Sequence, residues 1–379
     1  MTICFVADGL NKYFEVFGDK QSISLFVRSI FQLIFIFLGF LVVDKRSYDL
    51  YFGIFILLFC FLIGQTALLF GGQLTPNDFL LGFKVFNKFI YAFILFPVVD
   101  YILRKNPNLI ERLVKVFYGL FIANILIVLF GLFLDSELIK SYPLRERFGY
   151  SGLIPKRNEA TLFYVLGLSV GYFRLVVQKK KERPLFLIGL VGSLILGTKG
   201  MYIFLLFLGL FHIRFNKKLI KTLFIGLVVS FILIILILPN TEMYSYYYSQ
   251  AERLGFFTML LSGRDIIFFN ELNSMTQGWS ILNVFVGGQN QSNKIFEMDF
   301  LDLFFFLGVI GGLVYIFLYM KYFFASSKRI AYHYFFIFSY FFLAFFGGHF
   351  FSSAVNALYF VIVTLYIFNY KAIEKTYHK

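Results

Sequence analysis

The stretch LVKVFYGLFIANILIVLFGLFL, residues 113–134, decides the fold class of this chain. It is apolar over about the length that an α-helix needs to cross a bilayer, and its one charged residue is Lys115. Similar stretches recur along the chain. Hydrophobic residues make up 59% of the 379 residues and charged residues 15%, whereas soluble domains carry about 25% charged residues. The composition therefore excludes a water-soluble globule and predicts an all-α, polytopic integral membrane protein.

We expect a single integral membrane domain over residues 1–379 with about eleven transmembrane helices. The predicted spans cover residues 22–43, 48–70, 83–103, 113–134, 159–177, 185–197, 200–213, 220–238, 299–320, 331–346 and 354–370. Residues 185–213 are interpreted as two short helices, because one continuous helix would bury Lys199 in lipid. Their joining turn, Gly197-Thr198-Lys199-Gly200, is then expected at the floor of an outward-facing cavity.

Basic residues between the spans predict the orientation. Six segments hold 20 of the 35 Lys and Arg residues but only 4 of the 21 Asp and Glu residues. These segments are 44–46, 104–115, 178–183, 214–221, 321–329 and 371–379. The positive-inside rule places them in the cytoplasm, so the net charge of +14 is a topology signal and does not indicate a nucleic-acid partner.

The remaining connections are expected to face outward. The longest of them, residues 239–298, is the one external loop large enough to hold folded structure outside the bilayer. Residues 1–21 are expected outside as well, as an interfacial helix or as part of a tilted span. Cys4 and Cys60 lie far apart among apolar residues and provide no disulfide framework and no metal cluster.

Four basic residues near a predicted outer surface form the first group that could carry chemistry. Arg145 and Arg147 lie in the loop, and Lys156 and Arg157 precede the next helix. Arginine binds phosphate in a bidentate manner, and a helix N-terminus adds oriented N–H donors. The group is interpreted as a site for an anionic lipid head group such as a pyrophosphate. The alternative is interfacial anchoring beside a helix that Asn158 caps.

A second group is the turn that carries Lys199, where Thr198 can cap the following helix. A lysine at the bottom of a cavity indicates a functional site, whereas the alternative is a snorkelling or internally paired lysine. A third group is Ser262-Gly263-Arg264-Asp265 in the long loop. The preceding tyrosines could stack on sugar rings or form an interfacial aromatic belt; they are Tyr244, Tyr246, Tyr247 and Tyr248.

Carboxylates form the fourth group, at the outer end of the span 299–320. Asp299 and Asp302 are three residues apart and share one helix face, and Glu297 precedes them. They are candidates for a general base acting on a sugar hydroxyl, although carboxylates also favour a helix N-terminus for structural reasons. His349 lies at an outward turn and is either a base or a polar end cap. None of these groups has the spacing of metal ligands.

The order of these short motifs resembles the O-antigen polymerase and O-antigen ligase superfamily, and most closely its lipid-linked polysaccharide polymerases. The resemblance covers about residues 140–320 and consists of pieces that are individually short. They are Arg147-Phe148-Gly149 with Asn158-Glu159, Leu196-Gly197-Thr198-Lys199-Gly200, Ser262-Gly263-Arg264, Gly287-Gly288, and Glu297-x-Asp299-x-x-Asp302 followed by Gly308, Gly311 and Gly312.

The resemblance implies a metal-independent, inverting glycosyltransferase without a cofactor. Its substrates would be undecaprenyl-pyrophosphate-linked glycans at the outer face of a bacterial cytoplasmic membrane, and a chain-length regulator in the membrane would be a further partner. Carried over by position, Arg264 becomes both a catalytic and a donor-pyrophosphate residue. Arg145, Arg147, Lys156, Arg157 and Lys199 become further donor-pyrophosphate residues. Glu297, Asp299 and Asp302 become catalytic residues on the acceptor side, because carboxylates beside the pyrophosphate would repel it.

One departure from the ligase branch favours the polymerase. The ligases typically carry a histidine near the end of the long loop, and residues 239–298 contain none. Three functions stay open: a polymerase that extends a lipid-linked chain, a ligase that transfers the finished glycan to another acceptor, and a flippase of lipid-linked oligosaccharides. A flippase is expected to have related halves and discontinuous helices.

Overall fold

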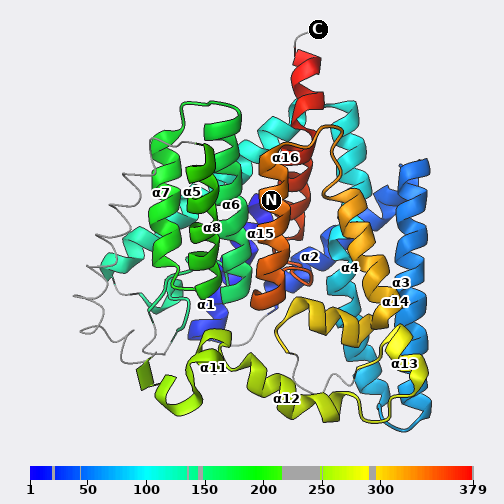
Figure 1. The fold of residues 1–379 in the computed structure, drawn as a ribbon. Coiled ribbons are helices and arrows are strands. Elements are labelled where there is room, and N and C mark those ends of the chain that lie inside the picture. The colour runs from blue at the N-terminus through cyan, green and yellow to red at the C-terminus, as the bar shows by residue number, and fades with distance from the viewer. Residues whose placement is uncertain are drawn as a thin grey trace.

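The computed structural model is helical, which confirms the predicted class (Figure 1). It describes residues 1–18, 22–42, 44–134, 136–143, 148–215, 248–249, 251–289 and 296–377. Among these residues there is no β-strand, and the one isolated bridge pairs Lys140 with Tyr150.

Six helices are long and apolar enough to cross a membrane. They are α2 (Ile23–Leu41), α3 (Lys45–Phe70), α4 (Pro76–Lys105), α5 (Asn108–Leu134), α6 with its π-helical continuation η2 (Arg157–Tyr172 and Phe173–Val177), and α14 (Asp299–Tyr322). Shorter helices complete the bundle: α1 (Thr2–Phe17), α7 (Arg183–Ile195), α8 (Lys199–Phe215), α15 (Ala331–Gly347) and α16 (Ala357–Tyr377). A 3-10 turn, η1 (Glu137–Ile139), follows α5.

Ten of the eleven predicted spans fall on helices of this set, and residues 220–238 lie outside the described residues. Residues 185–213 form two helices, α7 and α8, as predicted. The number of segments that cross the membrane stays a prediction, because six helices meet the length and hydropathy of a span. Residues 2–17 form the helix α1, and its face towards the bundle buries two charged side chains, Asp8 and Lys12.

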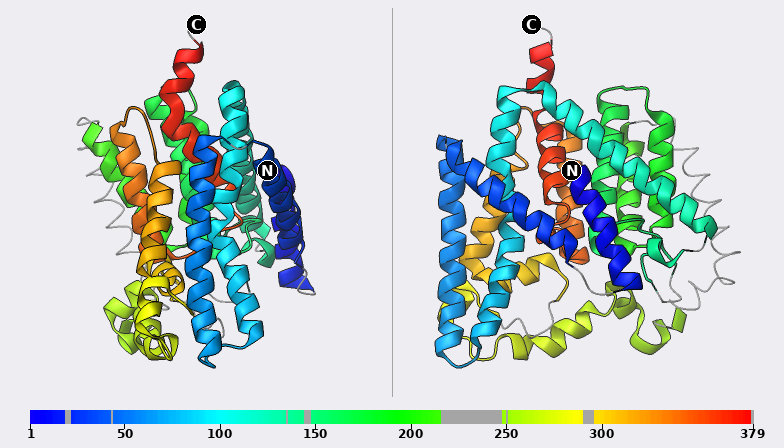
Figure 2. Two further views of the ribbon diagram at one scale, coloured as in Figure 1. Left: turned by 90° about the vertical axis from the view of Figure 1, so that its right-hand side faces the viewer. Right: turned by 180° about the vertical axis from the view of Figure 1, so that it is seen from behind.

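Three short helices lie across one end of the bundle. They are α11 (Phe256–Leu261), α12 (Arg264–Met275) and α13 (Ile281–Val286), and α12 runs at a large angle to α3, α4 and α14 (Figures 1 and 2). We call this end the lower end, as Figure 1 draws it. These helices belong to the described part of the predicted external loop 239–298.

The basic connections lie at the opposite, upper end. The turns between α2 and α3, α4 and α5, α6 and α7, and α14 and α15 all meet there (Figures 1 and 2). The basic segments 44–46, 104–115, 178–183 and 321–329 cover these turns or the helix ends next to them. In the sequence, basic connections alternate with nearly neutral ones. In the structure, these described basic connections lie at the upper end, and the described part of the long loop lies at the lower end.

Aromatic side chains fill the core next to the lower end. The hydroxyl of Tyr315 of α14 lies 3.0 Å from the carbonyl oxygens of both Phe89 and Phe351, which share its one proton. Tyr340 of α15 donates to the carbonyl oxygen of Phe350, also at 3.0 Å. The bonds to Phe350 and Phe351 satisfy backbone groups of the connection between α15 and α16, which a buried non-helical segment requires. The aromatic core thereby fixes the backbone on which the lower-end residues sit.

Candidate functional site

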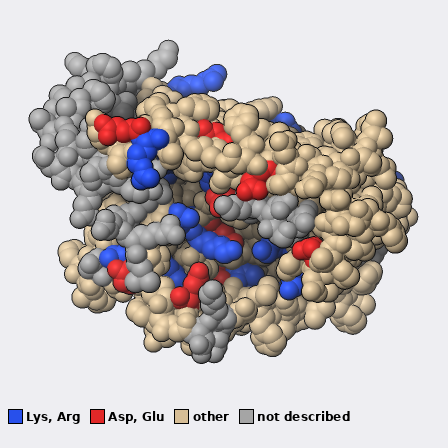
Figure 3. All heavy atoms as spheres, turned by 90° about the horizontal axis from the view of Figure 1, so that it is seen from below, with Lys and Arg blue, Asp and Glu red and all other residues tan. Residues whose placement is uncertain are grey.

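The lower face is hollowed, and Lys and Arg side chains gather in the hollow with Asp and Glu beside them (Figure 3). Of the first predicted group, Lys156 and Arg157 are exposed at the start of α6, and the Arg157 guanidinium lies 4.6 Å from the ring centre of Tyr142. Arg145 and Arg147 lie outside the described residues.

The alternative interpretation, in which Asn158 caps α6, is wrong by two positions. The helix begins at Arg157 with Lys156 at its N-cap, and no side chain caps it. Asn158 therefore lies inside the first turn. An Asn is a good cap only where the backbone leaves the helical conformation, and here the chain becomes helical before it reaches Asn158.

Backbone contacts join the first predicted group to the second. Tyr150 donates its amide to the carbonyl oxygen of Ile195 at 3.0 Å, and the Ser141 hydroxyl donates to the carbonyl oxygen of Leu196 at 3.0 Å. A Cβ on Gly149 would lie 2.6 Å from that same Leu196 oxygen, so the close approach requires glycine. The loop that precedes α6 is thus packed onto the turn between α7 and α8.

Lys199 joins the second group to the third. Its ammonium group donates to the carbonyl oxygen of Met259 and, at 3.1 Å, to the hydroxyl of Ser262. Ser262 and Gly263 both have left-handed backbone conformations, with φ of 59° and 78°, and they turn the chain from α11 into α12. Lys199 therefore holds the turn that presents Arg264.

Arg264, the first residue of α12, has a largely buried side chain, 14% exposed. It donates to the carbonyl oxygens of Phe346 at 2.6 Å and Gly347 at 3.3 Å, and it pairs with Glu297 at 3.5 Å. Its Nε is buried and has no hydrogen-bond partner among the described residues. Burial lowers the pKa of Arg264 against the opposing effect of Glu297, and the nearby positive charge of Arg157 lowers it further.

The three predicted carboxylates have different surroundings. Asp299 is 2% exposed, and it accepts hydrogen bonds from the backbone amides of His349 at 2.6 Å, Phe351 at 2.9 Å, and Phe350. Asp302 is also buried and accepts from the amide of Phe296 at 2.9 Å. The Glu297 side chain is 45% exposed. Glu297 is thus the carboxylate of this group that a substrate in the hollow can reach.

His349 occupies the turn after α15 with a left-handed φ of 64°. Burial lowers its pKa to about 4, and the positive charges of Lys156, Lys88 and Arg264 act in the same direction against Glu297. The imidazole is therefore neutral at pH 7 and has one nitrogen that can accept a proton.

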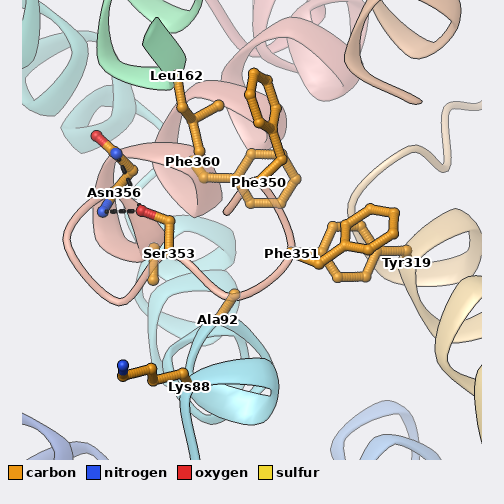
Figure 4. Close-up of a pocket in the computed structure, with 10 residues that line it drawn as sticks. Lys88, Ala92, Leu162, Tyr319, Phe350, Phe351, Ser353, Asn356 and Phe360 are labelled. Atoms are coloured by element: carbon orange, nitrogen blue, oxygen red, sulfur yellow. Dashed lines mark hydrogen bonds between the residues drawn. The ribbon is translucent and has the colours of Figure 1, made fainter. Parts of the chain in front are cut away.

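A pocket that the sequence analysis missed lies between α4 and the connection from α15 to α16 (Figure 4). Lys88 enters it from α4, and its side chain is exposed. On the other side the Ser353 hydroxyl accepts hydrogen bonds from the amide and side-chain nitrogens of Asn356, at 3.1 and 3.0 Å. The remaining lining residues are Ala92, Leu162, Tyr319, Phe350, Phe351, Ala357 and Phe360. Lys88 was recognisable in the sequence as a lysine inside the apolar span 83–103.

A buried ion pair supports the backbone next to this pocket. Arg28 of α2 pairs with Asp8 of α1 at 2.7 Å, and both side chains are almost fully buried. Arg28 also donates to the carbonyl oxygens of Ala354 at 3.1 Å and Val355 at 3.4 Å. The sequence analysis missed this pair as well, although Arg28 stood out as a charge within the span 22–43.

The structure thus brings together, at one end of the bundle, all the described residues of the predicted site. Lys156, Arg157, Lys199 and Arg264 supply cations from three helices, and Glu297, Asp299 and Asp302 lie at the start of α14. Of the four tyrosines, Tyr248 is exposed, and the other three lie outside the described residues. Within the described residues no cluster of three or more His, Cys, Asp and Glu side chains could hold a metal ion.

No family model, curated protein or solved structure matches this chain.

Proposed function

We propose that the protein is a membrane-embedded glycosyltransferase that polymerises surface polysaccharide such as O-antigen. It would join undecaprenyl-pyrophosphate-linked repeat units at the outer face of a bacterial cytoplasmic membrane, with its lower end facing outward. The observation that carries the proposal is the surroundings of Arg264. Its Nε donor lacks an acceptor among the described residues, Arg157 adds a nearby positive charge, and Lys199 holds the turn that precedes Arg264.

Such a set of cations suits the charge that develops on the donor. In the transfer, the bond between the anomeric carbon and the pyrophosphate oxygen breaks, and the electron pair stays on the pyrophosphate. Arg264 and Arg157 would stabilise the growing negative charge, which matters most where water is scarce. Lys199 would act through the turn that it holds, and in the open hollow it could also reach the phosphate.

The acceptor hydroxyl attacks the anomeric carbon and loses its proton. We assign Glu297 as the base that accepts this proton, because its carboxylate is accessible. Asp299 and Asp302, by contrast, accept hydrogen bonds from backbone amides. Attack from the face opposite to the leaving pyrophosphate gives inversion, as the resemblance to the polymerases implies. No cofactor and no metal ion takes part in this scheme.

A flippase of lipid-linked oligosaccharides is the second candidate. It is favoured by the interruption of α14 at Gly308, where φ is 69°, and by Lys88 within α4. Broken helices and charged residues inside the bundle are common in transporters. A ligase is the third candidate and would use the same cations with a separate acceptor.

Reconstituted protein with a synthetic polyprenyl-pyrophosphate oligosaccharide distinguishes these functions. We expect a ladder of extended lipid-linked products in the absence of any other acceptor. Product that forms only when a separate acceptor is added would identify a ligase. Movement of the unmodified lipid across the vesicle membrane without bond formation would identify a flippase and contradict the proposal.

Arg264→Ala in the same assay tests the assignment of the site. We expect extension to fall by about a hundredfold or more, the loss typical of a group that stabilises developing charge. Lys328→Ala is the matched control, because Lys328 is an exposed cation at the upper end. Near-normal ladders from the Arg264 variant, with folding intact, would refute the role of Arg264.

A further inference from the structure

We propose that residues 276–289, which contain α13, insert into the bilayer leaflet at the lower end as a short wedge, with the outer side of α13 in contact with lipid acyl chains. The sequence places these residues in a loop outside the membrane. The proposal rests on the membrane insertion that the six long apolar helices indicate, and it does not depend on the glycosyltransferase function.

The outer side of α13 is apolar and uncovered. Four of its six residues, Ile281, Leu282, Val284 and Phe285, are 44–79% exposed. The segment 276–289 contains no charged residue. A contiguous apolar patch of this kind on a protein surface indicates contact with a partner or with a membrane.

The depth of α13 follows from its contact with α3. Asn283 donates a hydrogen bond through its side-chain nitrogen to the carbonyl oxygen of Gly64 at 3.2 Å. Gly64 lies six residues before Phe70, the last residue of α3, which corresponds to about 9 Å along the helix axis. Phe70 is apolar and 90% exposed, so α3 continues to present an apolar surface below the level of α13. The wedge therefore lies within the apolar length of a membrane-spanning helix.

Backbone groups at the C-terminal end of the wedge have hydrogen-bond partners within the protein, as a segment in lipid requires. The amides of Gly287 and Gly288 donate to the carbonyl oxygens of Asn283 at 2.7 Å and Phe305 at 3.2 Å. The Gly287 carbonyl accepts from the Asn283 side chain at 2.8 Å, and the Gly288 carbonyl accepts from the indole nitrogen of Trp279 at 2.8 Å. Non-helical backbone is tolerated at membrane depth only where the protein provides such partners.

Two glycines, Gly64 and Gly308, allow the wedge to enter the bundle. A Cβ on Gly64 would overlap the carbonyl oxygen of Gly287, and a Cβ on Gly308 would overlap the carbonyl oxygen of Phe285. The interruption of α14 at Gly308 also frees the carbonyl oxygen of Phe305 for the amide of Gly288. The break in α14 and the insertion of α13 are thus one structural feature, which an external loop on the bundle surface would not need.

Lipid is the occupant that the observations favour over a second protein. The uncovered side of α13 adjoins apolar surface of α14, where Val309 and Ile310 are 43% and 46% exposed directly after Gly308, the residue that meets the backbone of Phe285. That surface belongs to one of the six helices suited to cross the membrane, so acyl chains already surround it in a bilayer. The same acyl chains can cover α13 without any further partner.

Trp279 offers a direct test, because it is the only tryptophan of the chain. It is partly buried, at the start of the wedge, with its ring 5.5 Å from that of Phe305. We reconstitute the full chain in vesicles of phosphatidylcholine brominated near the head-group end of the acyl chains. We expect the fluorescence to fall at least by half relative to unbrominated vesicles, and we expect aqueous iodide to quench weakly. Strong iodide quenching without quenching by bromine would overturn the proposal.

Cysteine labelling gives the second test, because Cys4 and Cys60 are both buried. Ile281→Cys replaces a 79% exposed side chain and therefore removes few protein contacts. In vesicles we expect it to react about tenfold more slowly with a charged maleimide than Glu252→Cys, an exposed position of the same end, because a thiol in apolar surroundings stays protonated. Both variants should react equally after denaturation.

Equal rates in intact vesicles would place Ile281 in water and refute the wedge. Protection that disappears in nanodiscs holding one copy of the chain would identify a second copy as the occupant and would also refute the lipid contact. Protection that persists in single-copy nanodiscs, together with quenching by brominated lipid, supports the proposal.

Discussion

At the scale of single residues, Glu297 and Asp299 have opposite surroundings although they are two positions apart. Asp299 accepts hydrogen bonds from three backbone amides of residues 349–351, whereas the Glu297 side chain is 45% exposed and pairs with Arg264. A carboxylate that satisfies buried amides holds the backbone, and an accessible one can exchange a proton with substrate. The two residues should therefore respond differently to substitution.

Asp299→Ala is expected to destabilise the protein by at least about 2 kcal/mol, because it leaves three buried N–H groups without an acceptor. Glu297→Gln keeps the size of the side chain and should lower the rate of extension by about a hundredfold while the midpoint of thermal unfolding is unchanged. Thermal unfolding in detergent and the extension assay measure both variants. If Asp299→Ala were stable but inactive, Asp299 would be the catalytic carboxylate and its proposed structural role would be wrong.

We expect His349 to make the stability of the folded protein sensitive to acid. Its pKa is about 4 in the folded protein and about 6.5 in an unfolded chain. Between these values the unfolded state binds a proton that the folded state does not, so the stability contributed by neutral His349 is complete above pH 6.5 and is lost as the pH falls to 4. His349→Asn also tolerates the left-handed backbone and should flatten this loss, as unfolding temperatures measured from pH 7 to 4 can establish. An unchanged pH profile would contradict the prediction.

At the scale of elements, α14 is two helical pieces joined at Gly308. The lower piece carries Asp299 and Asp302, and the upper piece packs Tyr315 and Tyr319 into the aromatic core. Since Gly308 has a φ of 69° and touches the backbone of Phe285, the break is fixed by α13. The position of the carboxylates thus depends on a contact between two elements and not on α14 alone.

Gly308→Ala is expected to destabilise the protein by about 1–3 kcal/mol or more, through the left-handed backbone and the overlap with Phe285. Gly119→Ala in α5 is the matched control. Apart from its own helix backbone, no described atom lies within 4 Å of the added Cβ there, and alanine favours the helix by up to about 1 kcal/mol. Thermal unfolding of both variants tests the comparison. Equal stability of the two variants would show that α14 can become continuous.

At the scale of the whole molecule, the charged residues have a different arrangement and role at each end of the bundle. The upper end gathers basic connections, as the positive-inside rule requires of a cytoplasmic surface. At the lower end, Lys and Arg side chains gather in a hollow (Figure 3), and α6, α8 and α12 begin with Arg157, Lys199 and Arg264. If the upper end faces the cytoplasm, the lower end faces outward, so the hollow should open to the outside of the cell.

Cysteine accessibility in intact cells measures this orientation. Glu252→Cys, at the lower end, should react with an impermeant maleimide added outside. Lys328→Cys, at the upper end, should react only after the membrane is permeabilised, because the basic connections are retained in the cytoplasm. The opposite pattern would place the hollow in the cytoplasm and remove the proposed substrate from reach.

The apolar stretches were sufficient to predict where most helices lie, because the length and hydropathy of a membrane span can be read from consecutive residues. They also gave the interruption between α7 and α8, because a charged Lys199 is costly in lipid. The same reasoning could have found Lys88 and Arg28, which are charges within predicted spans. It could not place Asn158 correctly, because a cap depends on where the backbone turns helical and not only on the residue type.

The sequence by itself determined the helical class, the approximate helix positions and the separation of basic from nearly neutral connections, since these follow from local hydropathy and charge. Only the tertiary structure decided which residues meet. It joined Lys199 to the turn before Arg264, tied Asp299 to the backbone of residues 349–351, and inserted α13 into the break of α14. Those contacts join residues far apart in the chain, and their energies depend on burial and on partners that no single stretch of sequence contains.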